Sequence, residues 1–188
     1  VIIPNSDVII AISESTKRDI ESFIKRDKLA PPAKIKVIRL GDDYSDKDKT
    51  KAVKPYLTIP EKFVLNVGTI EIRKNHRLIY YAYKLAAQKG IDLPTTVLAG
   101  KKGWQIEETY SLLQDDPTIK EKIVLANGVS DEELKWLYEN CMFTTLPTMY
   151  EGWGLTVAES LHYGKPCISG NTSSMPEIAD DRLVKFIS

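Results

Sequence analysis

Short apolar runs alternate with helix-like segments along most of the chain. Between the runs, apolar residues recur at helical spacing, as they do over residues 78–88. Alternation of strands with helices predicts a parallel sheet that has helices on both faces, which is a Rossmann-like α/β fold. The expected strands are Phe63–Val67, Thr96–Ala99, Ile123–Leu125, Met142–Leu146, Pro166–Ser169 and Leu183–Ile187.

Two helices have clear boundary signals. The residues Ser130-Asp-Glu-Glu133 form a capping box that predicts a helix start. A second helix is expected from Leu155 to Tyr163, with Gly164 as its stop. Its buried stripe is expected to consist of Leu155, Ala158 and Leu161. This stripe leaves Glu159 outside the core.

The N-terminal part of the chain reads as a separate small unit. Val8–Ala11 is expected to be a strand, Ser13 or Ser15 the cap of a helix, and Ile35–Ile38 a second strand. A polar stretch without periodicity follows. The expected division is residues 1–40 for this unit, 41–60 for an interdomain linker and 61–188 for the larger α/β unit. The chain begins without methionine, so we expect it to be a piece of a longer protein.

The composition describes an ordinary globular protein: 188 residues, 43% hydrophobic and 28% charged. The 26 basic residues balance the 26 acidic ones, so the chain has no overall field for nucleic acid or anionic lipid, and no nucleic-acid partner is expected. No apolar run approaches the length of about 18 residues that suggests a membrane span. Cys141 and Cys167 lack metal-like or redox-like spacing. Buried free thiols in a reducing compartment are expected.

The candidate chemistry centres on two carboxylates that flank a glycine-rich helix start, in Glu151-Gly-Trp-Gly-Leu-Thr-Val-Ala-Glu159. The glycines let the backbone approach a ligand, and the helix start favours an anion such as phosphate. Parallel sheets bind ligands outside the carboxyl ends of their strands. Four candidate residues follow expected strand ends: Gly68, Gly100, Gly128 and Glu151.

The nonapeptide resembles the Glu-x7-Glu motif of retaining glycosyltransferases with the GT-B fold, the large family usually numbered four. Further segments resemble that family in the same order: 12–19, 67–75, 98–104, 128–134, 164–169 and 173–178. The resemblance therefore covers nearly the whole chain. It implies that residues 61–188 form the nucleotide-sugar-binding domain, truncated at its C-terminal end, and that residues 1–40 end the preceding domain.

The resemblance also implies roles for the charged residues. Arg73 and Lys74 would neutralise the donor diphosphate, and Glu151 would lie by the sugar ring, so these three are the catalytic candidates. Glu159 would accept hydrogen bonds from the ribose hydroxyls. The alternatives are a solvated surface pair for the two cations, a plain loop residue for Glu151, and a surface helical residue near Lys165 for Glu159.

Further donor contacts are implied for Gly68, Thr69, Gly100, Lys101, Val129, Gly152, Trp153, Gly154 and Leu155. The backbone of Val129 would contact the base, and the amides of residues 152–155 would hold sugar and phosphate oxygens. Trp153 is expected to be a wall of the pocket. Many relatives carry an extra Arg where this sequence has Thr69, so one phosphate contact is missing or made by another group. A solvated turn is the alternative for Lys101.

The implied reaction is transfer of a hexose, with retention, from a nucleoside diphosphate sugar to a glycan or lipid-linked acceptor in polysaccharide biosynthesis. Residues 100–104 resemble a variant frequent in mannosyltransferases, so GDP-mannose is the expected donor. No cofactor is expected, and no metal, because no Asp-x-Asp lies where a metal-dependent donor site needs one. The largely missing N-terminal domain would hold the acceptor. The fragment alone is therefore not expected to be efficiently active.

Two other readings stay open. The first is a nucleotide-binding or assembly module without catalysis, which the loss of Glu159 or of the Arg73–Lys74 pair would mark. The second is another GT-B enzyme, such as a sugar-nucleotide epimerase or a phosphorylase. His76 and His162 have no partner at metal or triad spacing and are expected to be structural. The expected location is cytoplasmic, either free or at the inner face of the membrane in the full-length protein.

Overall fold

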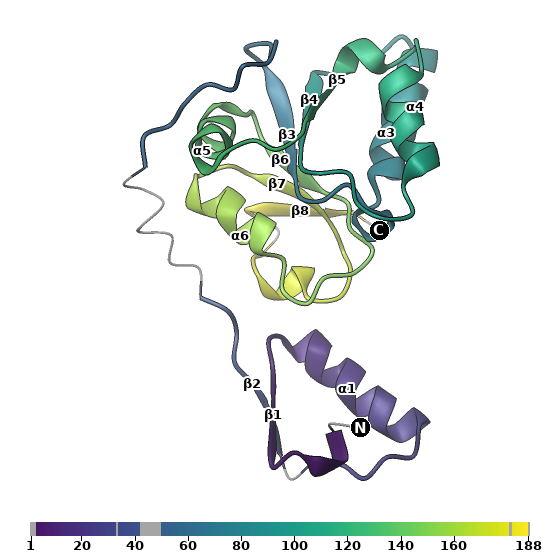
Figure 1. Cartoon of the computed structure of the whole chain (residues 1–188), viewed down its shortest axis with the longest axis vertical. Coiled ribbons are helices and arrows are strands. Elements are labelled where there is room, and N and C mark those ends of the chain that lie inside the picture. The colour runs from purple at the N-terminus through teal and green to yellow at the C-terminus, as the bar shows by residue number, and fades with distance from the viewer. Residues whose placement is uncertain (1–2, 33, 42–49, 181, 188) are drawn as a thin grey trace.

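The chain contains two separate sheets, which a computed structural model describes over residues 3–32, 34–41, 50–180 and 182–187. Residues 42–49, within the expected linker, lie outside the described residues. The first sheet is parallel and pairs β1 (Val8–Ala11) with β2 (Lys34–Val37) beside helix α1 (Glu14–Arg26). Ser13 is the cap of α1, because its hydroxyl accepts a hydrogen bond from the Thr16 amide at 2.9 Å. The second sheet forms the larger part of the molecule (Figure 1).

The larger sheet has six strands, all parallel, in the order β5-β4-β3-β6-β7-β8. Its strands are β3 (Phe63–Val67), β4 (Thr95–Ala99), β5 (Ile123–Ala126), β6 (Thr144–Leu146), β7 (Cys167–Gly170) and β8 (Val184–Ile187). The predicted parallel α/β sheet is confirmed. The main difference lies at β6, which begins at Thr144 rather than at Met142, because Thr144 is the residue paired in register with Leu65 of β3.

Four α-helices connect these strands. They are α3 (His76–Gln88), α4 (Glu107–Asp115), α5 (Asp131–Asn140) and α6 (Leu155–His162). Short 3-10 helices also occur: η1 (Ile3–Asn5), η2 (Ile72–Lys74), η3 (Lys120–Lys122) and η4 (Met175–Glu177). The predicted capping box opens α5, where the Ser130 hydroxyl accepts from the Glu133 amide at 3.3 Å and the Glu133 carboxylate accepts from the Ser130 amide at 2.9 Å. Helix α4 lies between two expected strands, where a helical segment was expected without stated bounds, and no side chain caps it.

Apolar clusters cover both faces of the larger sheet, because successive strand residues point to opposite sides. On β4, Val97 belongs to the cluster under α5, and Leu98 to the cluster under α3 and α4. Figure 1 shows α3 and α4 on one side of the sheet and α5 and α6 on the other. A third cluster joins α6 and η4 to β6, β7 and β8 through Leu146, Val157, Cys167, Met175 and Val184. No helix in the described ranges combines the length and apolar character needed to cross a membrane.

One prediction about α6 is wrong. Leu155, expected on the buried stripe, is 46% exposed. The buried residues of this helix are Val157, Ala158 and Ser160. The helix turns a mixed face to the sheet, since the Ser160 hydroxyl lies 2.7 Å from that of Thr144 and donates to the Lys165 carbonyl at 2.9 Å. Leu155 is the first helical residue and lies outside this contact.

Both cysteines are buried and free, which confirms that part of the prediction. Burial raises the pKa of each thiol, Cys141 and Cys167, to about 11. Both thiols are therefore protonated and unreactive in the folded chain.

His76 is a buried structural residue at the start of α3. Its Nε2 atom lies 3.0 Å from the side-chain oxygen of Asn66 on β3, and the Asn66 amide donates to the Thr145 carbonyl on β6 at 2.8 Å. These bonds join the helix to two neighbouring strands. Burial lowers the pKa of the His76 imidazole to about 4.

We predict that His76 makes the fold sensitive to mild acid. Above pH 6.5 the imidazole is neutral in both states, and its contribution to stability is complete. As the pH falls from 6.5 to about 4, only the unfolded chain takes up the proton, which costs the native state up to about 3 kcal/mol. The free energy of unfolding can be measured in urea at pH 7 and at about pH 4.5. Between these two pH values it should fall less for His76→Gln than for the wild type or for a matched His162→Gln variant. An NMR titration of His76 in the folded wild type with a midpoint near 6.5 would contradict the prediction.

Candidate functional site

The loops that follow β3 and β4 are joined beyond the ends of the strands. The Ile70 amide donates to the Lys101 carbonyl at 2.8 Å, and the Gly103 amide donates to the Ile70 carbonyl at 2.8 Å. A Cβ atom at Gly100 would lie 1.9 Å from the carbonyl oxygen of Gly68. The close approach of these two loops therefore requires glycine at position 100, whether or not a ligand contacts it.

The structure brings Arg73, Lys74 and Glu151 together at this edge of the sheet. The Glu151 carboxylate accepts from the Arg73 guanidinium at 2.6 Å and pairs with the Lys74 ammonium at 2.7 Å. Arg73 also donates to Glu71 at 2.6 Å and to the Tyr150 carbonyl at 2.8 Å. Burial disfavours the charged guanidinium, but the hydrogen bonds to Glu151 and Glu71 outweigh it and raise the pKa of Arg73. Two cations and two carboxylates thus balance one another.

The two cations lie on η2 rather than on α3 itself. Asn75 follows them in the left-handed conformation, with φ of 56°, which Asn tolerates better than most residues. This turn separates Lys74 from the helix start and directs its side chain along the loop after β3. A Cβ atom at Gly68 would lie 3.4 Å from the Lys74 ammonium, so the Lys74 side chain lies against the backbone at position 68.

The loop that carries Glu151 is held by short polar side chains. The Thr148 hydroxyl lies 3.1 Å from the Arg73 carbonyl and 3.2 Å from the Glu151 carboxylate. The Ser173 hydroxyl accepts from the Glu151 amide at 2.8 Å, and the Ser174 hydroxyl donates to the Glu151 carbonyl at 2.9 Å. The segment 173–178 resembles the family in sequence, but the resemblance implied no role for its serines. The local signal available was its Ser-Ser pair, which can bond backbone groups.

The backbone conformation at position 154 favours glycine. Gly154 has φ of 101° and forms the N-cap of α6, and a Cβ atom there would lie 2.3 Å from the end of the Met175 side chain. Beside it, Trp153 is buried, and its carbonyl accepts from the Ser174 hydroxyl at 2.9 Å. The guanidinium of Arg39 lies 5.9 Å from the centre of the Trp153 ring. Trp153 thus contacts the N-terminal unit.

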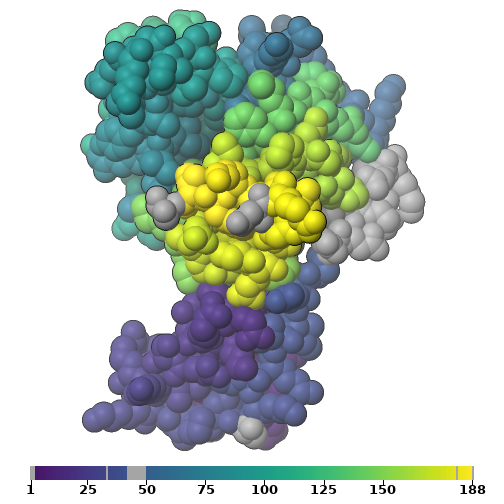
Figure 2. All heavy atoms as spheres, turned by 180° about the vertical axis from the view of Figure 1, so that it is seen from behind, coloured from purple at the N-terminus to yellow at the C-terminus, as the bar shows by residue number. Residues whose placement is uncertain are grey.

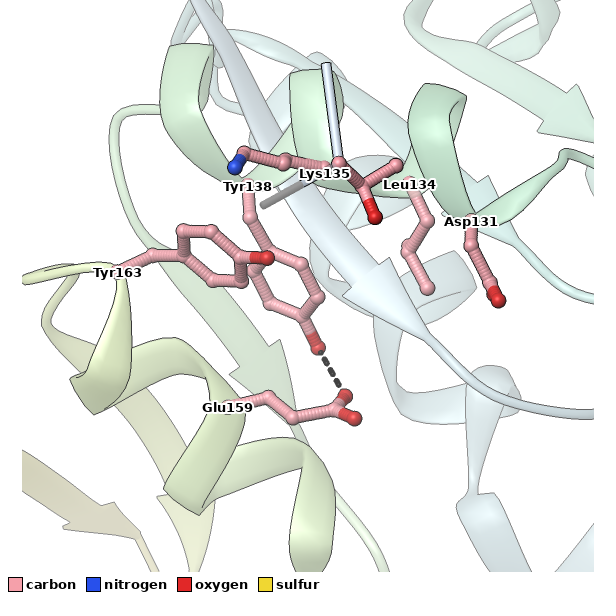
Figure 3. Close-up of a pocket in the computed structure, with 7 residues that line it drawn as sticks. Asp131, Leu134, Lys135, Tyr138, Glu159 and Tyr163 are labelled. Atoms are coloured by element: carbon pink, nitrogen blue, oxygen red, sulfur yellow. Dashed lines mark hydrogen bonds between the residues drawn. The ribbon is translucent and has the colours of Figure 1, made fainter. Parts of the chain in front are cut away.

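Glu159 lies in a separate cavity of about 200 Å³ between α5 and α6 (Figure 3). The cavity is lined by Thr50, Asp131, Leu134, Lys135, Tyr138, Glu159 and Tyr163. The hydroxyl of Tyr138 donates to the Glu159 carboxylate at 2.9 Å. The Tyr138 ring stacks on that of Tyr163, with 5.0 Å between centroids and 11° between planes. Glu159 was expected to lie outside the core, but the two tyrosines beside it were not predicted, because Tyr138 lies on α5 and Tyr163 at the end of α6, and no spacing in the sequence links the two helices.

The remaining candidates lie around the same edge without joining the ion pairs. Thr69 and Lys101 are exposed, and Val129 is partly buried against the apolar cluster under α5. The carbonyl of Gly152 accepts from the Thr16 hydroxyl at 3.4 Å. Over the described residues, no three His, Cys, Asp or Glu side chains are grouped so as to hold a metal ion.

Comparison with known sequences identifies proteins that are similar to this chain. The model of the family described as "Glycosyl transferases group 1" matches residues 48–187. The O-antigen chain mannosyltransferase B of Escherichia coli is 32% identical over 119 residues, which are 63% of this chain and 31% of that protein. The serotype-specific mannosyltransferase WbdA of Escherichia coli is 27% identical over 92% of this chain and 22% of its own length. The chain thus spans about a third or less of these relatives.

Solved structures show the same fold at low identity. A glycosyltransferase from Rickettsia africae has a TM-score of 0.73 and 19% identity, over 97% of this chain and 49% of that one. Anabaena HepE in complex with UDP and glucose has a TM-score of 0.68 and 16% identity, over 97% of this chain and 49% of that one. The architecture is therefore the Rossmann-like α/β fold of GT-B glycosyltransferases.

We predict that Gly100→Ala destabilises the chain by more than about 2 kcal/mol, because the added methyl overlaps the Gly68 carbonyl and the backbone must move. The matched control is Gly41→Ala, where nothing lies within 4 Å of the added atom. Chemical denaturation of the two variants beside the wild type measures both effects. Equal stability of Gly100→Ala and Gly41→Ala would show that the two loops do not approach as closely as described.

Proposed function

Since this chain belongs to the glycosyl transferases group 1 family, we propose that it binds the nucleoside diphosphate sugar from which a longer protein transfers a hexose. The observation that supports this most is the cluster of Lys74, Arg73 and Glu151 at the carboxyl edge of the parallel sheet. Ligands of open α/β sheets bind at that edge. The cluster lies beside the start of α6, which favours an anion.

The two cations have different roles in this proposal. Arg73 already donates to Glu151, Glu71 and the Tyr150 carbonyl, so its role is to hold the loop of Glu151. The Lys74 ammonium has three hydrogens, of which Glu151 takes one. Lys74 therefore contacts the diphosphate, and Glu151 faces the sugar. Catalysis is then electrostatic, because Lys74 and the amides at the start of α6 stabilise charge that develops on the leaving diphosphate.

Glu159 holds the ribose in this proposal. Its carboxylate can accept hydrogen bonds from both ribose hydroxyls, and the bond from Tyr138 fixes its orientation in the cavity between α5 and α6. Asp131 and Leu134 also line this cavity, near the start of α5. The base would lie there, against the backbone of Val129.

GDP-mannose is the proposed donor, supported by the mannosyltransferases among the relatives and by the residues 100–104. Transfer with retention, without a metal, to a glycan or lipid-linked acceptor is part of the same proposal. The rest of the longer protein would hold the acceptor. A cytoplasmic location, at the inner face of the membrane when the acceptor is a lipid-linked sugar, completes the proposal.

A thermal-shift panel of GDP, UDP, ADP and dTDP tests the proposed donor. We expect one diphosphate, GDP, to stabilise the chain clearly more than the others. At about 100 times its dissociation constant a ligand adds about 2.7 kcal/mol, which for a domain of this size is on the order of 5–10 °C. Unchanged melting across the panel would contradict a donor site. A larger shift with UDP than with GDP would contradict GDP-mannose.

Isothermal titration of Lys74→Ala tests the assignment of the diphosphate. Loss of a charge-assisted contact should weaken GDP binding by roughly ten-fold or more, and guanosine binding should change little. Arg73→Ala should instead lower the melting temperature, and its GDP affinity should stay closer to the wild-type value than that of Lys74→Ala. Lys89→Ala, an exposed lysine after α3, is the matched control. If Lys74→Ala lowers GDP and guanosine affinity equally, Lys74 does not contact the phosphates.

A further inference from the structure

The N-terminus of α1 is completed by a carboxylate from the far end of the chain. Glu177, on η4, accepts from the Glu14 amide and from the Ser15 amide, both at 2.8 Å, across 163 and 162 residues. Amides in the first helical turn have no partner within the helix, and the dipole there favours a negative charge. The Glu177 side chain is 13% exposed. This contact is therefore a largely desolvated, charge-assisted one.

The same unit also contacts the loop that carries Glu151. The Tyr150 hydroxyl donates to the Asp19 carboxylate of α1 at 2.6 Å. A Cβ atom at Gly152 would lie 3.0 Å from the end of the Ile12 side chain. Figure 2 shows the N-terminal unit, in purple, directly against the yellow C-terminal part of the larger unit. The β1–α1–β2 unit thus packs on both the Glu151 loop and η4.

One short segment connects these two sets of contacts. Ser173 and Ser174 bond the amide and the carbonyl of Glu151, at 2.8 and 2.9 Å. Three residues further on, Glu177 bonds the start of α1. Ser173 is left-handed, with φ of 47°, which is uncommon for serine and indicates that surrounding contacts hold the segment in place.

We propose that residues 173–177 couple the docking of the β1–α1–β2 unit to the position of Glu151, with Glu177 as the positioning residue. Loss of the Glu177 carboxylate would release the start of α1 and loosen the segment that holds the Glu151 backbone. The effect on sugar binding rests on the proposed function, in which Glu151 faces the sugar. The effect on the backbone does not depend on that function.

Amide hydrogen exchange of Glu177→Gln provides the test that needs no ligand. The amide side chain keeps the size of Glu177 but lacks its charge and one of its two acceptor oxygens. We expect exchange about ten-fold faster or more in the first turn of α1 and also in the loop 148–154, with strands β3 to β5 unchanged. Glu61→Gln, which changes an exposed carboxylate, is the control. Tyr150→Phe removes the hydrogen bond from Tyr150 to Asp19 and so loosens the contact between α1 and the Glu151 loop from the loop side.

Titration of the same variants with GDP and GDP-mannose gives the second readout. Glu177→Gln should lose affinity for GDP-mannose, as Glu151→Ala does, and should lose more affinity for GDP-mannose than for GDP. Faster exchange in α1 with an unchanged loop 148–154 would overturn the coupling. Unchanged exchange at both places would also overturn it. Wild-type chain that binds neither ligand would refute the proposed donor site, and the exchange experiment would still decide the coupling.

Discussion

The organisation of the candidate site depends on the need to pair a buried carboxylate. Glu151 is only 9% exposed, and an unpaired charge at such a position would cost several kcal/mol. Arg73 and Lys74 supply the partners from the loop after β3, whereas Glu151 belongs to the loop after β6. Because these strands are adjacent in the sheet, satisfying the carboxylate also brings two loops into a defined relation at the edge where ligands bind.

This pairing also determines what kind of field a ligand would meet. Glu71 and Glu151 offset the charges of Arg73 and Lys74, so the edge carries no large excess of positive charge. A diphosphate would be recognised by oriented donors already in place, chiefly Lys74 and the amides at the start of α6. Fixed donors of this kind need no reorganisation when charge develops, which is why preorganised sites are effective in catalysis. In the proposed function, specificity for a sugar would then depend on the position of Glu151.

The fold could be predicted from the sequence because its determinants are local. Apolar runs such as Phe63–Val67 must be buried, and the capping box at Ser130 marks a helix start whatever the surrounding fold. Helix α4 lacked such a signal, and the exposure of Leu155 depended on how α6 meets the sheet. Within the site, only the resemblance to a family predicted that Arg73 and Glu151 lie close together. The bonds from Tyr138 to Glu159 and from Glu177 to α1 arise from tertiary packing, which no spacing in the sequence reveals.

The same packing gives the glycines a structural role and joins the two units across their boundary. Gly100 and Gly154 were assigned to a ligand, yet Gly100 is also required where the Gly68 carbonyl approaches too closely for a side chain, and Gly154 is favoured by its φ of 101°. Through Met175 the segment η4 fills the space that Gly154 leaves, and through Glu177 it completes the first turn of α1. The two units lie apart along the chain, but hydrogen bonds join them. The loop that carries Glu151 therefore takes its shape from both units, and the smaller unit supports the candidate site.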